Sequence, residues 1–140
     1  MKINFITIAF FTGLMILVAT GCKEPMQKKI AGIWYIEDVS LSGDTSLLSS
    51  EQFKNAIEDQ KRLRFEMRED SSISIYTGSA EIDGKWWYVK NNKQVFVNLE
   101  GNIEPTLLGI YQEGKLINND TTSMGAIIRT VFVKAPAEDK

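Results

Sequence analysis

Arg62-Leu63-Arg64-Phe65-Glu66-Met67-Arg68 is the stretch whose pattern decides the fold. Leu63, Phe65 and Met67 alternate with charged residues, so one face of a β-strand would be apolar and the other charged. Residues 69–71 supply a turn, and residues 72–77 alternate again. The sequence therefore predicts a β-hairpin with one buried face.

The same period of two, interrupted by short turns, continues along most of the chain. Strands are expected over residues 33–41, 62–68, 72–77, 84–90, 94–99, 106–112, 115–117 and 126–134, with a polar loop over residues 118–123. Connections of hairpin length make strands that are neighbours in sequence neighbours in space. An antiparallel meander of this length must protect its edges, and closure removes them. We therefore expect an all-β fold, an up-and-down barrel of about eight strands.

One helix is expected between the first and second strands, over residues 49–61. Ser49 is a suitable N-cap, and Phe53, Ala56 and Ile57 share one helical face. An apolar helical face must be buried somewhere. The helix either covers the open end of the barrel as a lid, where Phe53 and Ile57 would contact a ligand, or packs against the outside of the sheet.

The N-terminus has the features of a secretory signal. Lys2 is followed by an almost wholly apolar run over residues 5–18, and small residues then precede Cys22, the only cysteine. Residues 18–22 (Val-Ala-Thr-Gly-Cys) resemble the lipobox of bacterial lipoproteins. The resemblance implies that Cys22 becomes the mature N-terminus and carries acyl chains such as palmitate, which anchor the domain in the bilayer. The alternative is an ordinary cleaved signal with an incidental cysteine.

These segments predict the organisation of the whole chain. Residues 1–21 would be the lipoprotein signal peptide, 22–29 a lipidated polar tether, 30–134 the barrel domain and 135–140 a polar tail. The expected location is the bacterial cell envelope, where the lipid-anchored domain faces the periplasm or the cell surface.

Composition limits the chemistry that we expect. The 140 residues suit one domain, and 16 basic against 18 acidic residues give a net charge of −2, which disfavours nucleic acid as a partner. Histidine is absent, which removes Ser-His-Asp and Cys-His catalysis and histidine-ligated zinc. The scattered acids show no spacing for a pair of catalytic carboxylates; they are Glu37, Asp38, Glu66, Glu81 and Asp83. We expect no enzyme, no metal and no cofactor.

A Gly-x-Trp motif opens the first strand and occurs again in mid-chain, as Gly32-Ile33-Trp34 and Gly84-Lys85-Trp86. With the meander, it resembles the lipocalin family and its bacterial lipocalin-like lipoprotein relatives. The resemblance implies that Trp34 packs at the closed end of the barrel and that an arginine of the last strand lies across it. Arg129 is the candidate, and a cation over an indole would stabilise the pair by about 0.5–2 kcal/mol.

Three consecutive aromatic residues, Trp86, Trp87 and Tyr88, must alternate between the two faces of their strand. One face would be core. The other would expose aromatic surface, which could contact a ligand, contact a partner or lie under a loop.

Two functions remain open from the sequence. The first is a membrane-anchored lipocalin-like protein that binds a small apolar or amphipathic molecule in its barrel. The second is a packed barrel without a ligand, a structural or interaction lipoprotein whose outer face meets another envelope protein. A cavity of about 300 Å³ or more, lined by apolar side chains, would favour the first function.

Overall fold

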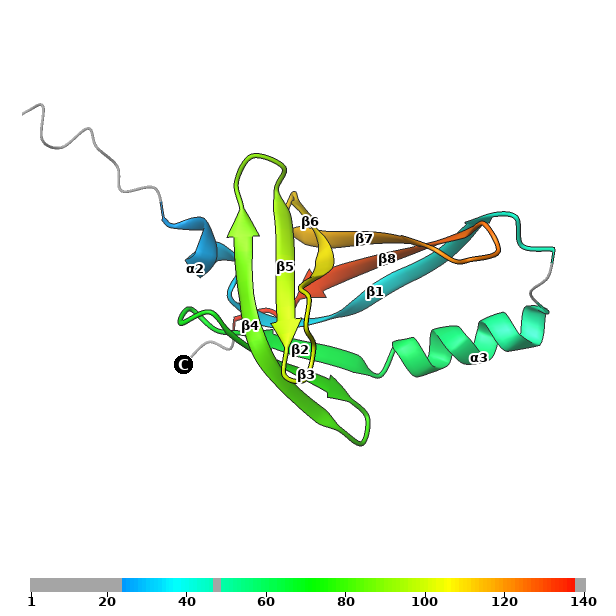
Figure 1. Ribbon diagram of the computed structural model, residues 1–140, viewed down its shortest axis with the longest axis horizontal. Coiled ribbons are helices and arrows are strands. Elements are labelled where there is room, and N and C mark those ends of the chain that lie inside the picture. Colours follow the sequence, from blue (N-terminus) through cyan, green and yellow to red (C-terminus); the bar gives the residue numbers. More distant parts are fainter. Residues whose placement is uncertain (1–23, 47–48, 138–140) are drawn as a thin grey trace, which may run out of the picture.

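The computed structural model describes residues 24–46 and 49–137, in which the strands follow one another around a closed antiparallel barrel (Figure 1). The predicted all-β barrel of eight strands is therefore confirmed. Cys22 and the predicted signal lie outside the described residues. The elements are α2 (Met26–Ile30), β1 (Gly32–Gly43), α3 (Ser50–Gln60), β2 (Leu63–Met67), β3 (Ser72–Thr77), β4 (Glu81–Val89), β5 (Gln94–Leu99), β6 (Thr106–Gln112), β7 (Lys115–Thr121) and β8 (Ala126–Lys134).

The first strand pairs unequally with its two neighbours. With β2 it pairs only from Gly32 to Tyr35, whereas its pairing with β8 runs from Trp34 to Gly43. The register with β8 shifts between Ile36 and Asp38, as at a β-bulge, which bends a strand. The outer half of β1 therefore leaves β2 and continues with β8, and α3 returns the chain from the end of β1 to the start of β2 (Figure 1).

The helix α3 forms where it is predicted, and its start is fixed by a capping box. The Ser49 hydroxyl accepts a hydrogen bond from the Gln52 backbone N–H at 3.2 Å. The Gln52 side-chain oxygen accepts one from the Ser49 N–H at 3.4 Å. Two orphan N–H groups of the first turn are thus satisfied by side chains.

Two strands, β4 and β7, extend at one end by three or more residues beyond the prediction, because neighbouring strands extend the pairing. The polar loop expected from residue 118 is instead the second half of β7, which pairs with β8 as far as Thr121. The Asn118 amide donates to the carbonyls of Leu107 and Leu108, at 3.3 and 3.1 Å, so a polar residue is satisfied within the sheet. The strand β4 begins at Glu81, opposite Tyr76, rather than at Gly84.

Residues 26–29, which are expected in the polar tether, belong instead to α2 and to the folded domain. Ile30 is fully buried and Met26 packs against the core. The Gln27 side-chain amide donates to the Glu69 carbonyl at 3.3 Å and also to the Ser71 hydroxyl. The helix therefore covers the end of the barrel where β1 starts, next to the β2–β3 turn.

The predicted clasp between Trp34 and Arg129 is wrong, and the register explains why. Arg129 lies opposite Ser40, six residues along β1 from Trp34, and its side chain is exposed. Six residues of strand span about 20 Å. The residue of β8 opposite Trp34 is Lys134, whose ammonium donates to the carbonyls of Lys29 and Ala31 at 2.7 and 3.3 Å. The last strand thus holds the start of the domain through a lysine.

Candidate binding sites inside and outside the barrel

The closed end of the barrel is filled by aromatic side chains. Trp34 is fully buried, and its indole N–H donates to the Ile30 carbonyl at 2.9 Å. Its ring stacks on Phe65 with centroids 6.3 Å apart, and Tyr111 meets it edge-on at the same distance. Phe132 packs edge-on against Phe65 at 5.1 Å. Trp34 is therefore part of the core.

The open end holds a small pocket of about 200 Å³, here called the mouth pocket. Half of its lining residues are polar, so it differs from the apolar cavity that would favour a carried lipid. Its volume also lies below the usual range of about 300–1,000 Å³ for small-molecule sites. The lining residues are Ile36, Gln60, Leu63, Asn118, Asp120, Ile128, Thr130 and Phe132.

The predicted ligand contacts are spread over three environments rather than gathered in one site. Phe53 and Ile57 are half-buried on α3, but the helix contributes Gln60, not these two, to the mouth pocket. Trp86 is buried in the core, and Tyr88 packs against the core from β4. Trp87 faces outward, 37% exposed, and stacks on Phe96 with centroids 5.9 Å apart.

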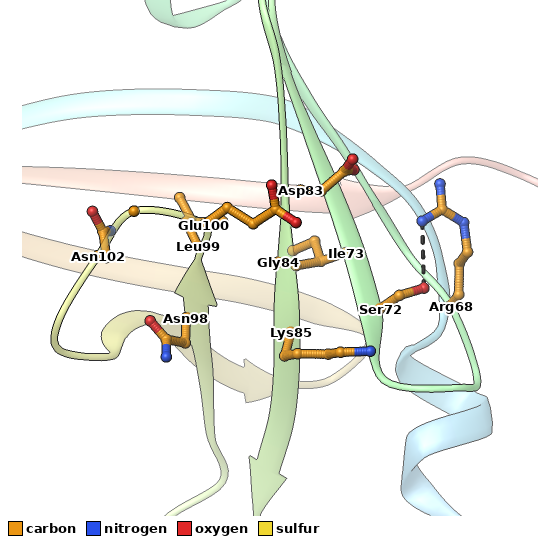
Figure 2. A pocket seen from close by; sticks show the side chains of 11 residues that line it. Arg68, Ser72, Ile73, Asp83, Gly84, Lys85, Asn98, Leu99, Glu100 and Asn102 are labelled. Atoms are coloured by element: carbon orange, nitrogen blue, oxygen red, sulfur yellow. Dashed lines mark hydrogen bonds between the residues drawn. The ribbon is translucent and has the colours of Figure 1, made fainter.

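The outer wall carries a larger polar groove of about 580 Å³, here called the outer-wall groove (Figure 2). It crosses β3, β4 and β5, where the register places Ser72 opposite Lys85 and Lys85 opposite Asn98. Glycine at position 84 is required here, because a Cβ would lie 2.4 Å from the Asn98 carbonyl oxygen. The lining residues are Arg68, Ser72, Ile73, Asp83, Gly84, Lys85, Asn98, Leu99, Glu100, Gly101 and Asn102.

One side of the outer-wall groove is fixed by Arg68. Its guanidinium pairs with Glu66 at 3.0 Å and donates to the Ser74 hydroxyl at 3.1 Å and the Ser72 hydroxyl at 3.4 Å. Partial desolvation lowers the pKa of Arg68, but the charge of Glu66 and the hydrogen bond to it outweigh this, so the pKa lies above its ordinary value. The Ser74 hydroxyl donates in turn to Asp83 at 2.5 Å. These contacts hold a positive and a negative group in place.

The turn beside the groove is held by another carboxylate, Asp70. The Ser72 hydroxyl donates to it at 2.6 Å and the Ser72 backbone N–H at 2.9 Å. These two hydrogen bonds keep the pKa of Asp70 below its ordinary value. The turn therefore places Ser72 rigidly at the groove.

Two polar groups of the outer-wall groove are left without partners in the part of the chain that the structure describes. The Asn98 side-chain oxygen is buried and accepts no hydrogen bond. The Lys85 ammonium makes no ion pair or hydrogen bond there; the register places Lys85 opposite Asn98, and its side chain extends toward Ser72 (Figure 2). A buried acceptor without a donor costs free energy, which a bound donor would recover.

Other surfaces of the described residues are less suited to a site. A groove of about 820 Å³ lies between the end of α3 and the β3–β4 turn, but it is lined by only six residues and none of its polar side-chain atoms is buried without a partner. Over residues 24–46 and 49–137, no three acidic or cysteine side chains gather to hold a metal ion. Within those ranges, no helix has the length and apolar character needed to cross a membrane.

The sequence interpretation missed the outer-wall groove. Its residues come from four separate segments, which only the strand register brings together. One signal in the sequence could have indicated the groove. Asp83, Lys85 and Trp87 occupy alternate positions of β4 and therefore share its outer face. A tryptophan among charged residues on an outer face is unusual for a surface that only contacts water.

Comparison with known proteins adds a structural neighbour. No family model matches the chain, and no curated protein is significantly similar to it. Among solved structures, a DUF4847 family protein from Bacteroides vulgatus is similar, with 10% sequence identity and a TM-score of 0.49. The match covers 76% of this chain and 96% of that chain. The assignment of the barrel fold comes from the strand pairing of this chain and not from that match.

Proposed function

We propose that the protein is a lipid-anchored, lipocalin-like barrel of the bacterial cell envelope that acts as an interaction module through its outer surface. The observation that carries this proposal is the filled interior: Trp34, Phe65 and Phe132 occupy the closed end of the barrel. The mouth pocket of about 200 Å³ is too small and too polar for a typical apolar ligand. Binding then takes place outside the barrel.

The anchor would fix the orientation of the domain. Cys22 lies four positions before the start of α2 at Met26, a reach of at most about 14 Å. An acylated Cys22 would therefore hold the closed end of the barrel close to the bilayer. The mouth and much of the outer wall would face away from it. The lipobox pattern of residues 18–22 supports this anchorage.

Native mass spectrometry of the full chain, purified from envelope membranes, tests both parts of the proposal. We expect a covalent mass increment of acyl chains on Cys22 and no additional small molecule that is released on denaturation. The matched variant Cys22→Ala should lose the increment and move to the soluble fraction. A variant that stays in membranes as strongly as the parent would contradict the anchor.

A second candidate function is favoured by the mouth pocket, where polar Gln60 and Asn118 lie beside apolar Leu63 and Ile128. Such a lining suits a small amphipathic molecule. If α3 is a lid, the double variant Phe53→Ser/Ile57→Ser should take up more of a fluorescent apolar probe than the parent while its strand signal is retained. Equal uptake would leave the filled barrel as the better account.

A further inference from the structure

We propose that the outer wall binds a neutral saccharide, with the outer-wall groove holding its hydroxyl groups and the Trp87–Phe96 pair holding a face of its ring. This inference deepens the proposed function, because it names the chemistry of the partner that the outer surface recognises. It rests on the positions of the aromatic pair, the unpartnered polar groups and the balance of charge.

The aromatic pair adjoins the outer-wall groove on the same face of the sheet. Lys85 and Trp87 are two residues apart on β4, and their partners on β5, Asn98 and Phe96, are likewise two apart. Alternate residues share a face, and two residues of strand span about 7 Å. A row of polar side chains is therefore followed, within the length of one sugar ring, by a row of stacked aromatic rings.

The aromatic pair is accessible and ordered. Trp87 is 37% exposed, although its ring stacks on Phe96 with planes 15° apart. The partner ring fixes the orientation of the indole, so a ligand meets a preformed flat surface. One face of a pyranose ring is rich in C–H groups, which pack well on such a surface and leave the hydroxyl groups free at the edge of the ring.

The groove offers the polar groups that hydroxyls require. A hydroxyl group both donates and accepts a hydrogen bond. The buried Asn98 oxygen needs a donor, and the unpaired Lys85 ammonium can donate to an oxygen. A single hydroxyl-rich molecule can satisfy both, whereas a purely apolar ligand satisfies neither.

The charges of the groove favour a neutral ligand. Its lining contains two cations, Arg68 and Lys85, and two carboxylates, Asp83 and Glu100, which sum to zero (Figure 2). Phosphates and other anions are recognised by an excess of arginine and lysine, which is absent from this lining. Recognition of a polycation would require an excess of carboxylates, which this lining also lacks. The volume of about 580 Å³ falls within the range of small-molecule sites.

The test is a titration of the full chain, solubilised in a detergent without a sugar headgroup, with cellopentaose, maltohexaose and chitohexaose. Binding is followed by calorimetry and by tryptophan emission. Trp34 and Trp86 are at most 1% exposed, so a shift in emission would report mainly on Trp87. We expect saturable binding of at least one of these oligosaccharides and a shift of emission to shorter wavelength.

Variants assign the binding to this face of the barrel. Trp87→Ala and Asn98→Leu should each raise Kd about tenfold or more, as when an anchor residue of a site is removed. Trp87→Phe should retain most of the affinity. The matched control is Tyr35→Ala, which removes another exposed aromatic side chain, from the outer face of β1. It should leave Kd unchanged.

Three outcomes would overturn the inference. These are no saturable binding of any of the three oligosaccharides at 10 mM, unchanged Kd in a folded Trp87→Ala variant, or binding only of an anionic control such as hexagalacturonate. Asn98→Leu provides a second variant if Trp87→Ala fails to fold. Cys22→Ala should bind sugar as the parent does, so failure of the anchor and failure of the sugar site are separate results.

Discussion

The two Gly-x-Trp motifs have the same spacing and place their tryptophans in similar ways, but their glycines are required for different reasons. The indole N–H groups of Trp34 and Trp86 each donate to a backbone carbonyl at 2.9 Å. Trp34 uses the carbonyl of Ile30, four residues earlier in the chain, whereas Trp86 uses that of Arg68, in the β2–β3 turn. The first motif thus ties the start of β1 to the end of α2, and the second ties β4 to the β2–β3 turn.

The glycines show the difference most clearly. Gly32 has φ of +145°, a backbone conformation that residues with a Cβ rarely adopt, and the Lys134 side chain crosses it. Gly84 has no such dihedral, but the backbone of β5 lies where its Cβ would be. Gly32 is required by its backbone dihedral, and Gly84 is required because there is no room for a Cβ. The same short motif therefore serves two different physical needs.

The largest effect that we expect comes from removing the tryptophan of the first motif. Trp34→Ala should lower the free energy of unfolding by about 3–5 kcal/mol, because a fully buried aromatic side chain is replaced by a cavity. The loss of stability is measured by urea denaturation. Trp87→Ala is the matched control, since its exposed ring should contribute only about 1 kcal/mol. Equal losses would mean that Trp34 is not a core residue.

Replacing the two glycines sharpens the comparison. Gly84→Ala should cost about 2–3 kcal/mol, since the new Cβ meets backbone atoms that cannot turn away. Gly32→Ala should cost about 1–2 kcal/mol through its dihedral, because the Lys134 side chain can move aside. A Lys134→Ala background should leave the cost of Gly32→Ala almost unchanged. A greater loss of stability for Gly32→Ala than for Gly84→Ala would contradict this explanation.

Loss of the lysine that covers the first motif should have a smaller effect. Lys134→Met keeps most of the aliphatic chain over Gly32 but removes the hydrogen bonds to the carbonyls of Lys29 and Ala31. We expect a loss of about 1 kcal/mol. Arg129→Met should change stability by less than about 0.5 kcal/mol, since Arg129 is exposed and distant from Trp34. Both losses are measured by thermal melts; a loss above about 0.5 kcal/mol for Arg129→Met would contradict its placement as an exposed residue without a stabilising contact.

The smallest effect concerns the turn that holds the second motif, and it depends on pH. Hydrogen bonds from Ser72 lower the pKa of Asp70 in the folded state below its ordinary value of 3.8. The ionised carboxylate therefore stabilises the fold above pH 3.8, and the gain is lost as the pH falls through the lower folded value. Asp70→Ala should be slightly less stable than the parent at pH 7, with the two converging in strong acid. A difference independent of pH would exclude this origin.

The sequence was sufficient for the strands and their order because alternation and short turns are local properties. Residues 72–77, 94–99, 106–112 and 126–134 were predicted with the bounds that the structure has. Residues 118–121 were not, since Asn118 and Asp120 are polar; the Asn118 amide is satisfied by carbonyls of β6, and the backbone of residues 118–121 pairs with β8. Local pattern cannot show such a partner.

The functional residues were harder to predict, because sites depend on register between strands. The family resemblance implied that Trp34 packs at the closed end, and its side chain is in the core there. The same resemblance implied an arginine of the last strand over Trp34, but Arg129 pairs with Ser40, six positions along β1. The outer-wall groove joins Arg68, Lys85 and Asn98, whose proximity follows from two successive registers that no single segment encodes.

The pairing of the first strand with the last has a consequence for how the chain folds. Trp34 and Lys134 lie opposite each other although they are 100 positions apart in sequence. Contacts between such distant residues form slowly, because a long loop must close before they do. Until β8 joins β1, the sheet has two open edges, at β1 and β7, which can pair with other chains. A folding intermediate that lacks the nine residues of β8 would therefore expose both edges at once.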